Sequence, residues 1–417
     1  MSLQILSLLF LVLAIVFGFV RKSNVGLVAL GAAPLLAYIG GVKTGVVFGG
    51  FPTKLFLTLL GTMLFFAVLQ DNGTLELFSK KIIALVGRKA FLIPVIIYIS
   101  SYILSAVGPG AISVQAVTIL FAVSLAVQMK ISPVLMAGMA LLGAVGGTVS
   151  PIALTGIIVK DLLAAQNITA DPTRIFLGVS IANAICAAII YVFFKGYRIR
   201  SDLQLKLSDT ERFNVKQSLS LAALAALVIL VVGLGQDVGL VSFVLALALI
   251  VVKAGNEKAA IKQIPWGVLL LICGVNVLMT VTKELGGITL LSNILATFMN
   301  DITAPLVIGM TGGTMSWFSS ANGVVLPTLI PAVPGIVANV GGNVTLLEMV
   351  MAICAGATVA GISPLSTGGS LTLAAYTQEK HIDEKEQSKL FAQLFALSAA
   401  QVVIVSLLGL FGLYRFF

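Results

Sequence analysis

Two serine–proline pairs interrupt apolar stretches of the chain, Ser150-Pro151 in GTVSPIALTG and Ser363-Pro364 in GISPLSTGG. Proline has no backbone amide hydrogen and disfavours helix at the residue before it, so each pair predicts a break in a helix. A broken helix leaves free amides at one new end and free carbonyls at the other. The amide end suits an anion, because the helix dipole places about half a positive charge there. The carbonyl end and nearby hydroxyls are oxygen ligands that suit a cation such as sodium.

Two turn-forming segments precede these pairs at equal distance. The first is Gly108-Pro109-Gly110 in SAVGPGAIS, and the second is Asn322-Gly323 in SSANGVVLP. Gly110 and Gly323 differ by 323 − 110 = 213 positions, and the two Ser-Pro pairs differ by the same offset, 363 − 150 = 213. The shared offset predicts an internal repeat. Paired interruptions at corresponding positions of two halves are typical of a binding site in a secondary transporter.

The composition places these motifs in a membrane. Hydrophobic residues make up 59% of the 417 positions and charged residues 10%, and the mean hydropathy is +1.11. A membrane-spanning helix needs about 20 apolar residues, so we expect an all-α polytopic membrane protein. The apolar runs are continuous and do not alternate with polar residues, which argues against a β-barrel. The net charge of +9 is expected in the loops and does not indicate nucleic-acid binding.

The elements that must position the motifs follow from the apolar pattern. Uninterrupted spans are expected at about 3–20, 25–41, 55–70, 175–194, 217–234, 238–252, 264–282 and 390–414. The regions 90–165 and 302–376 are apolar but rich in Gly, Pro, Ser and Thr, and each is expected to hold a re-entrant hairpin followed by a broken helix. Irregular backbone at membrane depth survives only where protein or a water-lined cavity satisfies it.

These elements predict two inverted repeats with about ten crossing helices. The first repeat is 1–194, with scaffold spans in 1–70, and the second is 217–417, with scaffold spans in 217–282. A polar linker, 195–216, joins them. With the N-terminus outside, 19 of the 25 Lys and Arg residues fall on the cytoplasmic side. This distribution predicts a cytoplasmic linker and both termini outside the cell (inner) membrane.

The motifs resemble those of the ion transporter superfamily, nearest to its divalent anion/sodium symporters and MatC-type malonate and dicarboxylate carriers. The most specific piece is Gly146-Gly147-Thr148-Val149-Ser150-Pro151, and the likeness in organisation covers nearly the whole chain. In that family both hairpin tips carry Ser-Asn-Thr, which bind carboxylate and sodium. Here the second tip keeps only Asn322, after Ser319-Ser320, and the first tip keeps none of the three. This departure fits the MatC-like branch better than the symporters.

The expected site residues come from the two tips and the two breaks. The expected substrate-binding residues are Gly108, Pro109, Gly110, Ser150, Pro151, Ser320, Asn322, Gly323, Ser363 and Pro364. The expected sodium-binding residues are Gly108, Thr148, Ser150, Ser320, Asn322, Thr358 and Ser363. We expect no charged side chain in this core, and the single histidine, His381, falls in a polar loop. Helix N-termini, hydroxyls and one amide must therefore bind an anion there.

We expect a secondary active transporter of small carboxylates, such as the dicarboxylates malonate or succinate, coupled to sodium and moving by an elevator-type shift. The alternatives are the membrane subunit of a tripartite, binding-protein-dependent transporter and a proton-coupled anion carrier or exporter. A proton-coupled carrier would normally place a titratable group in the core. The spans hold no catalytic pair or metal cluster, so we do not expect an enzyme. Sodium and the bilayer are the expected partners, with a homodimer as the expected assembly and no cofactor.

Overall fold

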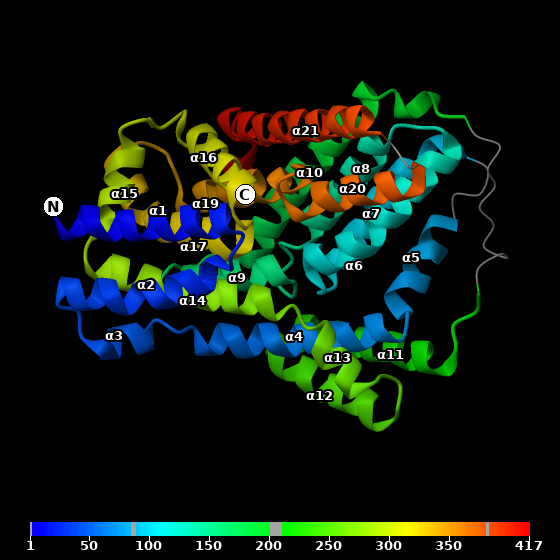
Figure 1. The fold of residues 1–417 in the computed structure, drawn as a ribbon, viewed down its shortest axis with the longest axis horizontal. Coiled ribbons are helices and arrows are strands. Elements are labelled where there is room, and N and C mark those ends of the chain that lie inside the picture. The colour runs from blue at the N-terminus through cyan, green and yellow to red at the C-terminus, as the bar shows by residue number, and fades with distance from the viewer. Residues whose placement is uncertain (1, 85–88, 201–210, 381–382) are drawn as a thin grey trace.

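The computed structural model describes residues 2–84, 89–200, 211–380 and 383–417, and every regular element in these ranges is a helix. The central part of the expected linker, 201–210, and His381 lie outside the described residues. Figure 1 shows the helices packed into one elongated body. The helices of the first half are α1(Leu3–Arg21), α2(Val25–Gly40), α3(Thr44–Gly49), α4(Thr53–Asp71), α5(Thr74–Ala84), α6(Ile93–Ala106), α7(Gly110–Met129), α8(Pro133–Gly147), α9(Leu154–Ala164) and α10(Pro172–Phe193).

The second half begins after the linker. Its elements are α11(Val215–Val228), η4(Ile229–Gly233), α12(Val238–Val251), α13(Glu257–Gln263), α14(Trp266–Glu284), α15(Gly287–Ala296), α16(Ala304–Phe318), η5(Ala321–Val325), α17(Leu326–Leu329), η6(Ile330–Ala332), α18(Val333–Val340), α19(Leu346–Val359), η7(Ala360–Ile362), α20(Thr367–Lys380) and α21(Glu384–Leu410). The eight uninterrupted spans expected from the sequence all coincide with helices, and most of their boundaries agree within about three residues.

Within the described residues, seven helical segments are long and apolar enough to cross a membrane. They are Thr44–Asp71, Gly110–Met129, Pro172–Phe193, Trp266–Glu284, Ala321–Val340, Leu346–Thr377 and Glu384–Leu410. Further apolar helices, such as α1 and α2, are shorter by this measure. The expectation of a multi-pass, all-helical membrane protein is confirmed, while the count of ten crossings stays a prediction.

Two helical hairpins form where the glycine-rich turns predicted them. In hairpin 1, α6 and α7 are joined by residues 107–109 and pack against each other. Gly108 has φ +142° and Gly110 has φ +75°, backbone conformations that L side chains rarely adopt. In hairpin 2, α16 ends at Phe318 and a second helical arm, Ala321–Val340, begins after Ser319-Ser320. Its shift from α17 through a 3₁₀ turn to α18 coincides with Pro327, Pro331 and Pro334.

Both Ser-Pro pairs lie in helix breaks. In broken helix 1, α8 ends at Gly147 and α9 begins at Leu154. In broken helix 2, α19 ends at Val359, the short η7 follows and ends at Ile362, and α20 begins at Thr367. The tight loops bring backbone close to backbone: an added Cβ would lie 2.0 Å from the Ser150 carbonyl oxygen at Gly156 and 2.2 Å from the Ser363 carbonyl oxygen at Gly369. Glycine is therefore required at both positions.

The outer helices of the two halves pack through matching glycines. Gly26 of α2 contacts the backbone of α14 at Leu270 and Gly274, and Gly61 of α4 contacts the backbone of α12 at Gly239. Gly239 lies 239 − 26 = 213 positions after Gly26, and Gly274 lies 274 − 61 = 213 positions after Gly61. Each half therefore supplies one member of both glycine contacts, at the offset already seen between the Ser-Pro pairs.

The helices also fall into two packing groups. The first, which we call the outer group, pairs α4 with α12 and α13, α2 with α14, and α1 with α2. The second, the hairpin group, pairs α6 and α7 with α8, α7 with α20, and α16 with α19 and α21. The hairpin group also includes α9, which contacts α7, and η5, which contacts α16. Contacts between the groups are fewer and include α9 with α4 and η5 with α14. In Figure 1 the outer group lies along the lower and left part of the view, beside the hairpin group.

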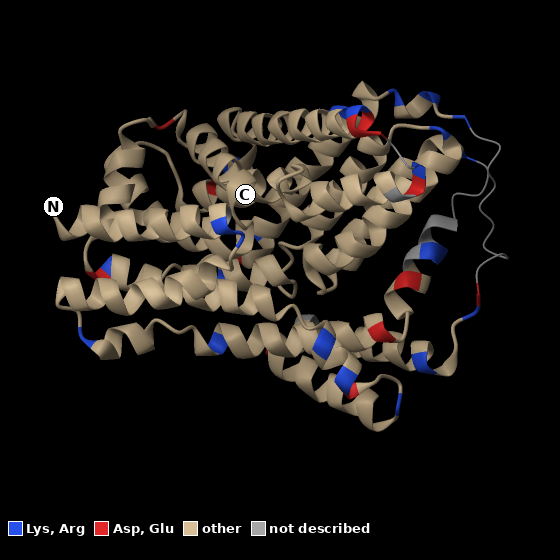
Figure 2. Ribbon diagram, in the orientation of Figure 1, with Lys and Arg blue, Asp and Glu red and all other residues tan. Residues whose placement is uncertain are grey.

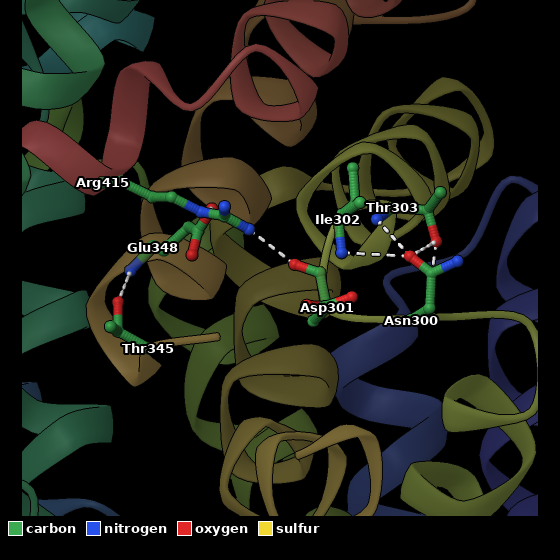
Figure 3. A network of polar contacts seen from close by, with 7 residues as sticks. All are labelled: Asn300, Asp301, Ile302, Thr303, Thr345, Glu348 and Arg415. Atoms are coloured by element: carbon green, nitrogen blue, oxygen red, sulfur yellow. Dashed lines mark hydrogen bonds and ion pairs between the residues drawn. The ribbon is translucent and has the colours of Figure 1, made fainter. Parts of the chain in front are cut away.

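One buried acid was not expected from the sequence. The Glu348 side chain, in the first turn of α19, has no exposed surface and lies within the candidate span Leu346–Thr377. The Arg415 Nε donates to Glu348 Oε1 at 2.9 Å, and a second Arg415 nitrogen donates to the Asp301 carbonyl oxygen (Figure 3). This ion pair joins the C-terminal residues to α19, which explains how a carboxylate is accommodated there.

Candidate binding site

A cavity of about 280 Å³ lies among the tips of both hairpins and both helix breaks. We call it the central cavity. Its polar lining residues are Gln115, Thr148, Thr155, Ser316, Ser319, Ser320, Asn322, Thr358, Ser366 and Thr367. No charged side chain is among its lining residues. Figure 2 agrees on the larger scale, because the charged residues lie mainly toward helix ends and connecting segments.

A chain of hydrogen bonds crosses from the first half to the second at this cavity. The Ala111 amide donates to Thr148 Oγ1 at 3.2 Å, the hydroxyls of Thr148 and Thr155 lie 3.1 Å apart, and the Thr155 hydroxyl donates to Asn322 Oδ1 at 3.0 Å. Because Thr155 uses its hydrogen on Asn322, Thr148 is the donor in the middle contact. The carbonyl oxygen of the Asn322 amide is thereby fixed, and its NH₂ group keeps two hydrogens for a ligand.

Four helix N-termini also meet at the cavity. The lining includes residues from the first turns of α7, α9, the arm Ala321–Val340 and α20. First-turn amides have no carbonyl partner within their own helix, and each N-terminus carries about half a positive charge. An anion in this cavity would therefore be stabilised by converging dipoles and amide donors, without a cationic side chain.

The structure brings four of the expected site residues into the cavity lining: Thr148, Ser320, Asn322 and Thr358. Asn322 is 9% exposed, and Ser320 accepts a hydrogen bond from the Gly323 amide, which keeps its own hydroxyl hydrogen available. The Thr358 hydroxyl donates within its helix to the Cys354 carbonyl, so its oxygen can only accept from or coordinate a ligand.

The other expected residues lie outside the cavity lining. Gly108 and Pro109 line a smaller cavity against α4, where Gly108 approaches Phe66, and Gly323 faces Leu271 of α14. Gly110 packs against Leu154. The two Ser-Pro pairs, Ser150-Pro151 and Ser363-Pro364, form the helix breaks but do not line the cavity themselves. The helices that follow the breaks, α9 and α20, line the cavity with residues of their first turns. The binding roles of the two pairs stay predictions.

Sequence reasoning did not single out several lining residues, chiefly Gln115 and Thr155. Gln115 is a polar side chain inside an apolar helix, 5% exposed, and a polar group buried in a span is itself a signal of function. Thr155 follows the first break by four residues, and only the contact with Asn322 in the other half reveals its part.

A second polar cluster lies behind the first helix break. The Ser101 and Ser105 hydroxyls of α6 are fully buried and, among the described residues, have no hydrogen-bond partner; the same holds for Asn183 Oδ1 of α10. Ser105 packs against Gly147 at the end of α8, and Ser101 against Gly143. Buried hydroxyls normally find a partner, and these oxygen atoms are of the type that a sodium ion prefers.

Comparison with known proteins finds a matching family model and a similar fold. Residues 1–148 match the family model described as the N-terminus of the dicarboxylate carrier protein MatC. A search of curated proteins gives no match. Among solved structures, the YdaH transporter of Alcanivorax borkumensis is similar in fold, with a TM-score of 0.58, 14% sequence identity, and coverage of 90% of this chain and 89% of that chain.

The family model describes the N-terminus of a carrier, and the similar solved structure is that of a transporter. The resemblance to MatC-type carriers expected from the motifs is confirmed over the first 148 residues, which include hairpin 1 and the whole of α8. The chain is thus a multi-pass membrane protein whose fold is similar to that of the YdaH transporter, and its N-terminal part is similar to that of the dicarboxylate carrier protein MatC.

Proposed function

We propose that this protein is a secondary active transporter of small dicarboxylates, such as malonate or succinate, and that the central cavity is its binding site. The observation that best supports this proposal is that four helix N-termini and the Asn322 NH₂ group meet at a cavity without charged lining residues. Such a site binds carboxylate oxygens through amides and dipoles. The match to a dicarboxylate carrier family supports the substrate class.

Sodium is the proposed coupling ion. Bringing an anion inward against a negative-inside potential costs about 2.3 kcal/mol per charge per 100 mV, so uptake needs cations. The cavity lining has no titratable side chain to bind a proton, and the buried Glu348 is paired with Arg415 outside that lining. The cavity hydroxyls of Thr148 and Thr358, together with the unpartnered Ser105 behind the first break, supply oxygen ligands instead.

The proposed movement is a shift of the hairpin group against the outer group. The sparse contacts between the groups support this elevator-type mechanism, because a sliding boundary must not be held by extensive packing. The two inverted repeats are part of the same proposal. The glycine contacts between Gly26 and Gly274 and between Gly61 and Gly239, related by the 213-residue offset, support it.

The placement of the chain in the membrane is also proposed. We infer an inner-membrane protein with ten crossings, the linker in the cytoplasm and both termini outside. Figure 2 supports this orientation, since most Lys and Arg residues gather toward the end of the molecule away from the N-terminus. A homodimer is the proposed assembly.

Ligand-induced stabilisation of the purified protein tests the binding site. Malonate or succinate is expected to raise the melting temperature, more so in sodium than in potassium buffer. Asn322→Ala removes one or two hydrogen bonds to a charged group, roughly 1.5–3 kcal/mol each, and should weaken binding more than tenfold. Asn339→Ala, on the same helical arm but exposed and away from the cavity, is the control. Equal ligand affinity in the wild type and Asn322→Ala would remove the central cavity from consideration.

A further inference from the structure

The polar side chain of Gln115, on hairpin 1, is almost fully buried and has no hydrogen-bond partner among the described residues. It lies on α7, one turn after the tip, and is 5% exposed. No hydrogen bond to its amide is found among the described residues, although it lines the central cavity together with Ala111 and Ile112 of the same helix face. Neither amide atom is among the fully buried unpartnered atoms of the described residues, so the Gln115 amide keeps its remaining accessible surface in the cavity, where a ligand can exchange hydrogen bonds with it.

The first turns of α9 and α20 differ between the two halves, and the difference leaves space beside Gln115. Thr155, which contacts Asn322, has its counterpart at Gly368, since 368 − 155 = 213. Gly368 has no side chain, and an added Cβ there would lie 3.3 Å from Gln115 Oε1. The Gln115 amide oxygen therefore lies close to Gly368, in the first turn of α20.

Two amide side chains thus reach one uncharged cavity from different hairpins. Asn322 comes from hairpin 2 with its NH₂ group directed by Thr155, and Gln115 comes from hairpin 1 with both amide atoms available. A dicarboxylate has two charged carboxylates, and each must replace its hydrogen bonds to water with hydrogen bonds to donors of the protein. The first-turn amides of α20 and the Gln115 NH₂ group together offer donors to the second end.

We propose that Gln115 binds the second carboxylate of the substrate and thereby sets the preference for dicarboxylates over monocarboxylates. This inference rests on the proposed function and adds a specificity-determining residue to it. Among the lining residues only Gln115 and Asn322 carry an amide side chain.

Succinate and butyrate are suitable probes, because both have four carbons and they differ in the second carboxylate. Gln115→Leu keeps the approximate size of the side chain and removes its hydrogen bonds. We expect the affinity for succinate, measured by thermal stabilisation in sodium buffer and by the KM of uptake, to fall about tenfold or more, the effect of losing a hydrogen bond to a charged group. The affinity for butyrate should change less than threefold.

Gln115→Glu is the second variant, since it keeps the shape and places a like charge against the second carboxylate. Its loss of succinate affinity should exceed that of Gln115→Leu. The matched control is Gln128→Leu on the same helix, where Gln128 is exposed and contacts Ser124 outside the cavity. This control should bind both probes as the wild type does.

Three results would overturn the assignment: unchanged succinate affinity in both Gln115 variants, an equal loss for succinate and butyrate, or a change confined to the sodium dependence, which would make Gln115 an ion ligand. Wild-type protein that is stabilised by succinate but does not transport it would contradict the proposed transport function. The role of Gln115 would then be decided by the binding affinities of its two variants. Wild-type protein that is not stabilised by succinate would contradict both.

Discussion

At the residue scale, Thr155 determines how Asn322 faces the central cavity. Its hydroxyl donates to Asn322 Oδ1 at 3.0 Å and accepts from Thr148, so the amide NH₂ group is left for the substrate. Thr155→Val keeps the shape and removes the donor. Losing a neutral hydrogen bond costs about 0.5–1.5 kcal/mol, so we expect the KM for dicarboxylate uptake to rise roughly threefold to tenfold while the protein stays folded.

The control for this variant is Thr118→Val on α7. Thr118 is also buried, and its hydroxyl donates to the Val114 carbonyl without lining the cavity. Uptake kinetics by the control should match those of the wild type. A KM that is the same in Thr155→Val and Thr118→Val would show that the orientation of Asn322 does not depend on this contact.

At the element scale, the outer helices depend on glycine. An added Cβ at Gly274 of α14 would lie 2.1 Å from the Gly26 carbonyl oxygen of α2, so Gly274→Ala forces the two helices apart. Overpacking of this kind typically costs about 1–3 kcal/mol, and the melting temperature in detergent should fall. Gly31→Ala on α2 meets nothing within 4 Å and removes a poor helix former, so it should leave the melting temperature unchanged or raise it.

An equal fall in melting temperature for Gly274→Ala and Gly31→Ala would show that the loss is not specific to the contact between α2 and α14. No fall for Gly274→Ala would contradict the close backbone contact. The same contact bears on the proposed repeat. Gly61→Ala on α4 would place a Cβ 2.3 Å from the Gly239 carbonyl oxygen of α12, so it should destabilise the protein about as much as Gly274→Ala does.

At the scale of the whole molecule, the proposed orientation places the linker end near Tyr197 in the cytoplasm and the turn at Lys43, before α3, outside. Tyr197 and Lys43 are both exposed, whereas all three native cysteines are buried. A membrane-impermeant thiol reagent applied to intact cells should therefore label Lys43→Cys and not Tyr197→Cys, with little background. Permeabilised cells should label both variants, and the reverse pattern in intact cells would invert the topology.

Much of this architecture was predictable because local chemistry specifies it. Asn24 and Asp237 cap the first turns of α2 and α12, and the Ser-Pro pairs lie in the two breaks. The cavity was less predictable, because its lining depends on contacts between distant segments. Thr155 meets Asn322 across 167 positions, and Gln115 lies close to Gly368 of α20 in the other half of the chain. Glu348 was missed for the same reason, since its partner Arg415 lies 67 positions away.

Uptake by reconstituted protein is the most direct measurement of the central claim. Proteoliposomes with an inward sodium gradient and no binding protein are expected to accumulate labelled succinate or malonate above its external concentration, and to lose this accumulation when sodium is replaced by potassium. Asn322→Ala should abolish the uptake in the same vesicles. Equal accumulation driven by a proton gradient in sodium-free buffer would contradict sodium coupling, and no accumulation under either gradient would contradict the assignment of this protein as a secondary dicarboxylate transporter.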